Sequence, residues 1–379
     1  ASTQAAAAGA EVTACLDGAA LTDSVVLAGR DALLPSAMAT AQLAGGVVDG
    51  IGEVPSARWA AELLPLVAGP IASRMRHGGF VSGVQLLDNA AFGVSPAEAA
   101  AMDPQQRVLL ENGYAALHRS PFDRASLNGS DTGVALGIYA TEFAQLLAGS
   151  PLGRSVYATA NSLSVASGRV SFALGLHGPC ASFETACSAS LVAGHSAVRA
   201  LQHAECSAHL AAGINLMLSP AAGVLWAIAG LTSLLGRSFT WDTRADGYAR
   251  GEACCTVALR EETGSAIGVQ LICALGSTVR QDGRSASLTA PNGQAQQGLL
   301  AAALQDAGTY VDSLMLNEAH GVPPNGHAHV LETRLPTLWR QPVRRVGARH
   351  IFNKPRAQRR EKKRSIAVSE PLWAEDFVK

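Results

Sequence analysis

This 379-residue sequence lacks cysteines spaced as in a disulfide framework or a metal site. The seven cysteines include no Cys-x-x-Cys pair and follow no regular spacing; they occupy positions 15, 180, 187, 206, 254, 255 and 273. This distribution argues against a disulfide framework and against a zinc ribbon. We therefore expect no metal site, and an intracellular reducing compartment such as the cytoplasm or a plastid.

Long apolar stretches are also lacking, and the first residues do not resemble a leader segment. Glycine, serine or a charged residue interrupts every apolar run before it reaches the length of a membrane span. The first eight residues carry neither a basic segment nor a clean apolar core, so they do not predict a secretory signal. We expect no membrane span.

Lysine is absent from most of the chain. Residues 1–339 hold 17 arginines, no lysine and 26 acids, whereas residues 340–364 hold eleven basic residues and one acid. This abrupt change in composition predicts a solvated, disordered tail. The tail has few aromatic residues and no nucleic-acid-binding motif, so we do not expect nucleic acid as a partner, although its charge leaves phosphate binding open.

The rest of the chain is rich in apolar and small residues. Hydrophobic residues make up 48% of the sequence and charged residues only 16%, and there are 38 glycines. These proportions are typical of compact α/β proteins, in which helices pack closely on a sheet. The patterns predict strands at 25–29, 132–139, 209–217, 253–260, 267–275 and 314–317, and helices at 104–118, 188–204 and 297–307.

One stretch predicts a reactive thiol. Residues 178–193 read Gly-Pro-Cys-Ala-Ser-Phe-Glu-Thr-Ala-Cys-Ser-Ala-Ser-Leu-Val-Ala, in which a strand-like run leads to Cys187 and a helical pattern follows. A thiol in the first turn of a helix faces free backbone N–H groups and the positive end of the helix dipole, which favour the thiolate. The alternative is a buried cysteine that packs as a small hydrophobe, as free cysteines usually do. His195 lies two turns further along this helix, and we expect it to pack rather than to act as a base.

Several stretches resemble the β-ketoacyl synthases, in particular the ketosynthase domains of modular polyketide synthases. The residues around Cys187 resemble the family's active-site turn, and this similarity favours a nucleophile over a buried thiol. Further similar stretches are Pro55-Ser-Ala-Arg-Trp59, Met102-Asp-Pro-Gln-Gln-Arg107, Ala245-Asp-Gly-Tyr-Ala-Arg-Gly-Glu252, Leu288-Thr-Ala-Pro-Asn-Gly293 and Glu318-Ala-His-Gly321. In the second of these, Asp103 and Pro104 also predict a helix start, and Gln106 is placed for a capping box.

The resemblance implies an acyltransferase that carries out decarboxylative Claisen condensation in polyketide or fatty-acid biosynthesis. By motif position, Cys187 would accept the acyl group, and His320 would hydrogen-bond the thioester carbonyl of a malonyl-type extender. The resemblance implies no bound cofactor, because the family's substrates are carried on the phosphopantetheine of an acyl carrier protein. The implied partners are this carrier protein and a second copy of the chain, in a homodimer or a larger assembly.

The resemblance ends after Gly321. The family's Thr-Gly-Thr is replaced by Val322-Pro-Pro324, and no later Lys-x-x-x-Gly-His stretch supplies the family's lysine and second histidine. The alternative function is therefore a catalytically impaired subunit that acts as a dimer or carrier-protein-binding partner. His320, His327 and His329 suggest zinc, but no cysteine or carboxylate cluster accompanies them, so we do not expect a metal there.

The implied fold is α/β, with the layered αβαβα arrangement of thiolase-like proteins, its first half complete and its second half partial. We predict four regions: a loose N-terminal lead-in at 1–23, an N-terminal half with the nucleophile at 24–262, a partial C-terminal half at 263–335 and a basic, disordered tail at 336–379. An incomplete second half would leave an apolar face uncovered, so we expect either a partner on that face or low stability.

Overall fold

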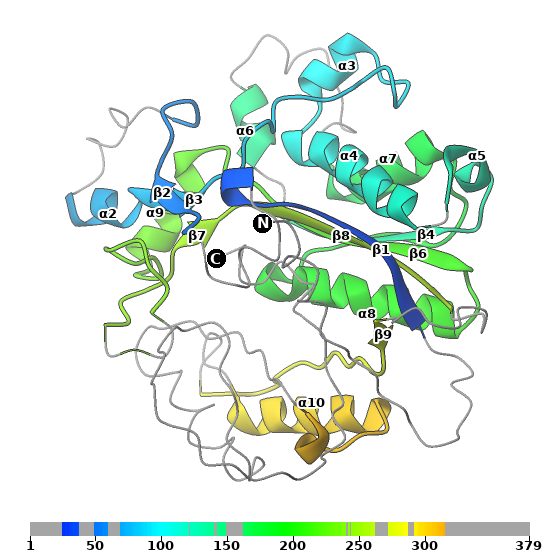
Figure 1. Ribbon diagram of the computed structural model, residues 1–379. Helices are drawn as coiled ribbons and strands as arrows, with labels where there is room; N and C mark the ends of the chain where they lie inside the picture. Colours follow the sequence, from blue (N-terminus) through cyan, green and yellow to red (C-terminus); the bar gives the residue numbers. More distant parts are fainter. Residues whose placement is uncertain are drawn as a thin grey trace, which may run out of the picture.

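The computed structural model of the chain describes residues 25–37, 49–59, 69–120, 122–139, 142–148, 162–239, 242, 244–261, 272–286 and 292–314. Within these ranges the chain forms a six-stranded sheet and a three-stranded sheet, both flanked by helices (Figure 1). The strands are β1 (Val25–Leu33), β2 (Ile51–Glu53), β3 (His77–Gly79), β4 (Gly133–Ile138), β5 (Cys180–Phe183), β6 (Ala208–Asn215), β7 (Arg250–Gly251), β8 (Ala253–Glu261) and β9 (Cys273–Ala274). The helices are α2 (Gly69–Arg74), α3 (Pro96–Ala101), α4 (Pro104–Arg119), α5 (Arg124–Leu127), α6 (Glu142–Ala148), α7 (Leu163–Leu174), α8 (Ala189–Gln202), α9 (Pro220–Ile228) and α10 (Gly293–Asp306), with 3-10 turns η1 (Pro35–Ala37), η4 (Ala186–Ser188) and η5 (Val311–Ser313).

The large sheet has the strand order β5-β4-β6-β8-β1-β9. Strands β5, β4 and β6 run parallel, whereas β8 is antiparallel to both β6 and β1, and β9 is antiparallel to β1. The three parallel strands therefore end at the same edge of the sheet, and the segments that follow them meet there. The small sheet has the order β2-β3-β7.

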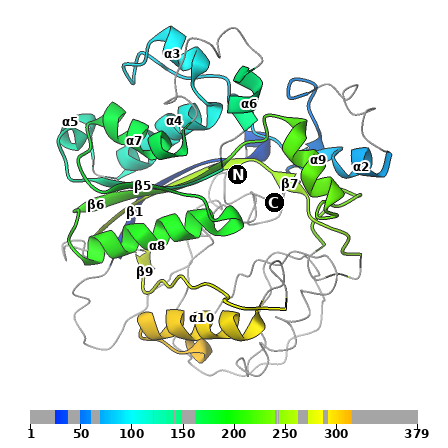
Figure 2. The ribbon, with the colours of Figure 1, turned by 180° about the vertical axis from the view of Figure 1, so that it is seen from behind.

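Helices cover both faces of the large sheet. Helices α4 and α7 pack on one face and α8 packs on the other, and α10 lies beyond α8, on its far side from the sheet (Figures 1 and 2). Arg199 of α8 bonds to Asp306 at the end of α10, with 2.7 Å between Nη2 and Oδ1. No helix in the described ranges combines the length and the apolar character that a bilayer crossing requires.

The two faces of the central strands differ in side-chain size. Val134, Leu136 and Ile138 of β4 belong to the core cluster under α4 and α7, whereas Ala135 belongs to the cluster under α8. Strand β6 repeats this pattern, with Leu210 toward α4 and α7. Small residues on the α8 face bring this helix close to the sheet, which fixes the position of the turn that precedes the helix.

Most of the predicted elements are present, but the first strand is longer than expected. The strand was predicted to end at Gly29, yet β1 continues to Leu33 with an irregularity in register between Leu27 and Gly29. A Cβ at Gly29 would lie 2.2 Å from the carbonyl oxygen of Ala116 in α4, so this glycine allows close helix packing and does not end the strand. Of the strands predicted at 267–275 and 314–317, only β9 is observed; residues 267–271 and 315–317 lie outside the described ranges.

Candidate active site

Cys187 lies in η4, the short turn that joins β5 to α8. Ser188 is the N-cap residue of α8, so the thiol stands immediately before the helix, close to its predicted place. The side chain of Cys187 is exposed, so the alternative of a buried hydrophobe is wrong. No side chain caps this helix start, because the Ser188 hydroxyl donates back to the carbonyl oxygen of Thr185 at 2.9 Å. The positive end of the α8 dipole therefore lies beside the thiol.

The residue before Cys187 has a strained backbone. Ala186 adopts a φ of 56°, in the left-handed region, which costs a non-glycine residue roughly 1–2 kcal/mol. This conformation helps to turn the chain from β5 into α8 within a few residues and leaves the thiol of Cys187 at the surface. Strain of this kind persists only where the surrounding structure holds it in place.

Two glycines in neighbouring strands provide that support. Gly137 of β4 and Gly213 of β6 are paired across the sheet, directly beneath the first turn of α8. A Cβ at Gly137 would lie 2.4 Å from the backbone nitrogen of Ser190, and a Cβ at Gly213 would lie 2.6 Å from the Ser190 Cβ. The start of α8 therefore packs directly against the backbone of β4 and β6, and any larger side chain at either position would displace the helix that follows Cys187.

The thiol lies at the edge where β4, β5 and β6 end, which is where ligands bind in parallel α/β sheets. Tyr248, from the loop before β7, lies within electrostatic reach of Cys187. Burial is the main cause that raises the pKa of the Tyr248 phenol, and the negative charge of a Cys187 thiolate raises this pKa further. The charge of Arg250 opposes this rise.

Arg58 and Glu252 form a buried ion pair next to this edge. Their atoms Nη2 and Oε2 are 2.6 Å apart, and the two side chains are 11% and 0% exposed. Glu252 also accepts hydrogen bonds from the backbone N–H groups of Val81 (2.9 Å) and Met217 (2.8 Å). Burial raises the pKa of Glu252 to about 7, although Arg58 and the two N–H groups limit this rise. The pair joins the chain segments after β2, β3, β6 and β7.

The stretch from Met102 to Arg107 connects the same strand ends. Asp103 caps α4 by accepting a hydrogen bond from the Gln105 backbone N–H at 2.8 Å, as predicted. The Gln105 side chain donates to the carbonyl of Tyr139 (3.0 Å) and accepts from the N–H of Leu216 (3.1 Å), so it joins the ends of β4 and β6. The predicted capping box is wrong, because Gln106 instead accepts a hydrogen bond from the guanidinium of Arg169 in α7.

His195 packs against the layer below α8, as predicted. Its Nδ1 atom lies 2.9 Å from the hydroxyl oxygen of Ser277. Burial is the main cause that lowers the pKa of His195, and the neighbouring Arg199 adds to this effect. The hydrogen bond to Ser277 accounts for this histidine without a catalytic role.

His320, the second predicted catalytic residue, lies outside the described residues, as do His327, His329 and the predicted tail at 336–379. Its role therefore stays a prediction. Among the residues that the structure does describe, no group of three or more histidine, cysteine, aspartate or glutamate side chains is arranged to hold a metal ion.

The residues that support the turn at Cys187 were not predicted from the sequence. Gly137 and Gly213 interrupt otherwise apolar strands, and a glycine within a strand often indicates that another backbone approaches closely. That signal was present in the sequence. The pairing of Arg58 with Glu252 was not visible in the same way, because the two residues are 194 positions apart.

Comparisons with known proteins agree with this geometry. The family model of the β-ketoacyl synthase N-terminal domain matches residues 22–264, and that of the C-terminal domain matches residues 271–323. A phenolphthiocerol/phthiocerol polyketide synthase of Mycobacterium tuberculosis is 41% identical over 280 residues, which are 72% of this chain and 18% of that protein. Polyketide synthase GfsB of Streptomyces halstedii is 38% identical over 320 residues, which are 82% of this chain and 6% of that protein.

Solved ketosynthase structures share the fold. The oxazolomycin ketosynthase domain of Streptomyces albus JA3453 superposes with a TM-score of 0.72 at 29% identity, over 79% of this chain and 55% of that one. The ketosynthase from module 6 of the Bacillus subtilis 168 bacillaene synthase gives a TM-score of 0.74 at 26% identity, over 84% and 55%. The chain thus spans about half the length of these ketosynthase structures and a small part of the two synthases. The predicted thiolase-like α/β fold is confirmed, and the chain belongs to the β-ketoacyl synthase family.

Proposed function

We propose that this chain transfers an acyl group from a carrier-protein thioester to Cys187 and condenses it with a malonyl-type extender. The observation that carries the proposal is the position of Cys187: exposed, beside the N-terminus of α8, at the carboxyl edge of the parallel strands. A nucleophile at this edge is accessible to a substrate, and the positive end of the helix dipole lies beside it. The family relationship supplies the reaction class.

In the first step, the Cys187 thiolate attacks the carbonyl carbon of the acyl thioester. The tetrahedral intermediate then expels the carrier's pantetheine thiolate, which takes up a proton, and the acyl group remains on the Cys187 sulfur. The negative oxygen of the intermediate needs hydrogen-bond donors, and backbone N–H groups at the start of a helix are suitable ones. The strained turn at Ala186 and the two supporting glycines hold this arrangement in place before the substrate arrives.

In the second step, the extender's carboxylate leaves as CO2 and the electron pair forms an enolate at its thioester. The enolate carbon attacks the acyl carbonyl on Cys187, a carbon–carbon bond forms, and the Cys187 thiolate leaves. His320 is proposed to donate a hydrogen bond to the enolate oxygen. The family's lysine and second histidine have no counterparts in the sequence, so this step depends on His320 more strongly than in the family pattern.

We further propose that two copies of the chain pair through β5. This strand is at the end of the described sheet order, and its first residues, Cys180 and Ala181, are exposed. Phe172 of the adjacent helix α7 is 89% exposed. An open strand edge beside an exposed aromatic ring is suited to a symmetric contact between two copies.

A condensation assay tests the proposed function. The full chain is incubated with an acyl carrier protein that bears an acyl group and with the malonyl form of the same carrier, and the β-ketoacyl product is measured by mass spectrometry. Cys187→Ser should abolish product, and His320→Ala should reduce it while acylation of Cys187 continues. His195→Asn is the matched control and should leave product formation unchanged. Wild-type product formation by C187S would overturn the proposal.

A further inference from the structure

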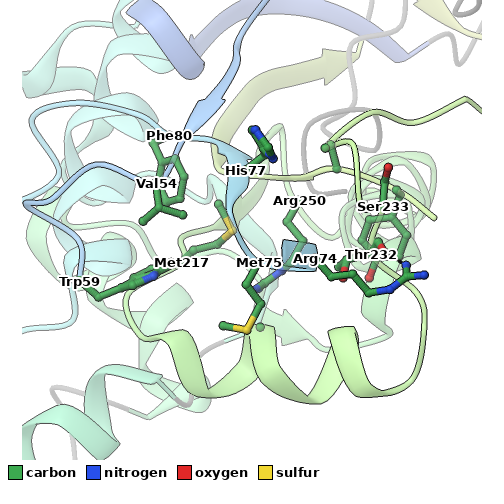
Figure 3. Close-up of a pocket in the computed structure, with 14 residues that line it drawn as sticks. Val54, Trp59, Arg74, Met75, His77, Phe80, Met217, Thr232, Ser233 and Arg250 are labelled. Carbon is green, nitrogen blue, oxygen red and sulfur yellow. Dashed lines mark hydrogen bonds between the residues drawn. The ribbon is translucent and has the colours of Figure 1, made fainter. Parts of the chain in front are cut away.

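A pocket next to the small sheet carries positive charge and no acid in its lining. It lies between α2, α9 and the chain that leads into β7, and Figure 3 shows the side chains around it. Arg74, His77 and Arg250 are its ionisable basic residues, and none of the lining residues is an aspartate or a glutamate. Tyr248, which lies within electrostatic reach of Cys187, also lines this pocket.

The two guanidinium groups differ in their partners. Arg74 donates from Nη1 to the carbonyl oxygens of Thr232 and Asp246, which are uncharged partners. Arg250 forms a long ion pair with the buried Glu142, with 4.0 Å between Nη2 and Oε1. The carboxylate of Asp246 is already engaged, because the Ser233 hydroxyl and the Leu234 N–H both donate to it (2.5 and 2.9 Å).

Unsatisfied polar atoms gather at the same place. Six buried side-chain polar atoms lack a partner among the described residues, and three of them line this pocket: Trp59 Nε1, His77 Nδ1 and Thr232 Oγ1. Trp59 and Thr232 are only 9% and 3% exposed, so bulk water does not account for these atoms. Buried polar groups without a partner are rare and need an explanation, and an ordered water or a bound ion supplies one.

The hydrogen-bonding groups that line the pocket determine which kind of ligand it can bind. An indole N–H and guanidinium N–H groups only donate hydrogen bonds, and a threonine hydroxyl can donate as well. A group that only accepts and carries negative charge complements this set, and such charge-assisted bonds are among the strongest in proteins. We propose that the pocket binds a small oxyanion, a carboxylate or a phosphate, through Arg74, Arg250 and the Thr232 hydroxyl.

This site refines the proposed function and rests on it, because the proposed substrates supply the anion. The malonyl-type extender carries a carboxylate, and the pantetheine arm of the carrier carries a phosphate. Binding of the anion itself does not require the thiol.

The test measures binding of sodium malonate and of inorganic phosphate to the full chain by calorimetry, at constant ionic strength set with sodium chloride. Arg250→Met should weaken binding by roughly tenfold or more, because a hydrogen-bonded charge is lost. Thr232→Val keeps the shape of the side chain and should weaken binding by about threefold, at the lower end of the range for one hydrogen bond. Arg76→Gln is the matched control, since this exposed arginine next to the pocket removes the same charge and should leave binding unchanged.

The outcomes distinguish the two sources of the anion, and they separate the anion site from the proposed acyl transfer. Binding of malonate alone assigns the site to the extender's carboxylate, and binding of phosphate alone assigns it to the pantetheine arm. Absence of binding by both anions, or equal binding by T232V, R250M and R76Q, would overturn the site. If R250M does not fold, T232V decides. The Cys187→Ser variant should bind the anion as well as the wild type, so a failure of acyl transfer and a failure of anion binding are distinguishable.

Discussion

Replacing Gly137 by alanine should displace the start of α8 and impair acyl transfer. The new Cβ would lie 2.4 Å from the Ser190 backbone nitrogen, about 1 Å closer than ordinary van der Waals contact allows. Overpacking of this kind costs about 1–3 kcal/mol of unfolding free energy. Because Cys187 precedes this helix turn, a shift of about 1 Å should also slow acylation by roughly a hundredfold.

Urea unfolding and the rate of acyl transfer measure the two effects. Gly168→Ala is the matched control, because nothing lies within 4 Å of its added Cβ in α7, and alanine there should stabilise the helix by roughly 0.5–1 kcal/mol. A second comparison uses Gly213→Ala, whose clash is with the Ser190 side chain. Ser190→Gly should therefore rescue G213A but not G137A. A G137A chain with wild-type stability and wild-type acylation would refute this account of the supporting glycines.

Three further predictions concern other parts of the molecule. Arg58→Met should lower the free energy of unfolding by about 3–5 kcal/mol, because it leaves Glu252 buried and unpaired. Arg76→Met removes one partner of an exposed ion pair and should lower it by less than about 1 kcal/mol. Equal losses in urea unfolding would contradict a stabilising role of the buried pair. Burial raises the pKa of Glu252 to about 7 from its usual 4.5, so the folded chain holds this proton more tightly than the unfolded chain does. The stability of the wild type relative to Glu252→Gln should therefore fall as the pH rises from 4.5 to 7; a constant difference would contradict this. Phe172→Glu should shift the chain from dimer to monomer in light scattering, whereas Leu225→Glu, at a similarly exposed position on α9, should not; a dimer that both variants preserve would place the contact elsewhere.

The sequence predicted the order of the main elements because their signals are local. The apolar runs gave β4, β6 and β8, and Asp103 with Pro104 gave the start of α4, since these patterns depend only on neighbouring residues. Gly29 shows where local patterns mislead. A glycine in a turn and a glycine under a helix look alike in sequence, and only the packing of α4 distinguishes them.

The site was predicted less completely than the fold. Cys187 was singled out from its surroundings in the sequence, and the structure places it exposed before α8, while its role as the nucleophile stays a prediction. The capping box at Gln106 failed because a tertiary partner, Arg169, competes for the same side chain. The contact of Arg58 with Glu252 depends on the whole chain path, so local sequence patterns could not reveal it.

The central claim is that Cys187 is the acyl-accepting nucleophile, and one measurement tests it most directly. The full chain is mixed with an acyl carrier protein bearing a thioester-linked acyl group, and the modified peptide is located by mass spectrometry. Cys180 is the internal control, because it is also exposed but lies in β5, away from the helix start. The account predicts acylation of Cys187 that is lost in C187S and retained in C180S. Acylation at Cys180 alone, or none on the folded wild-type chain, would contradict it.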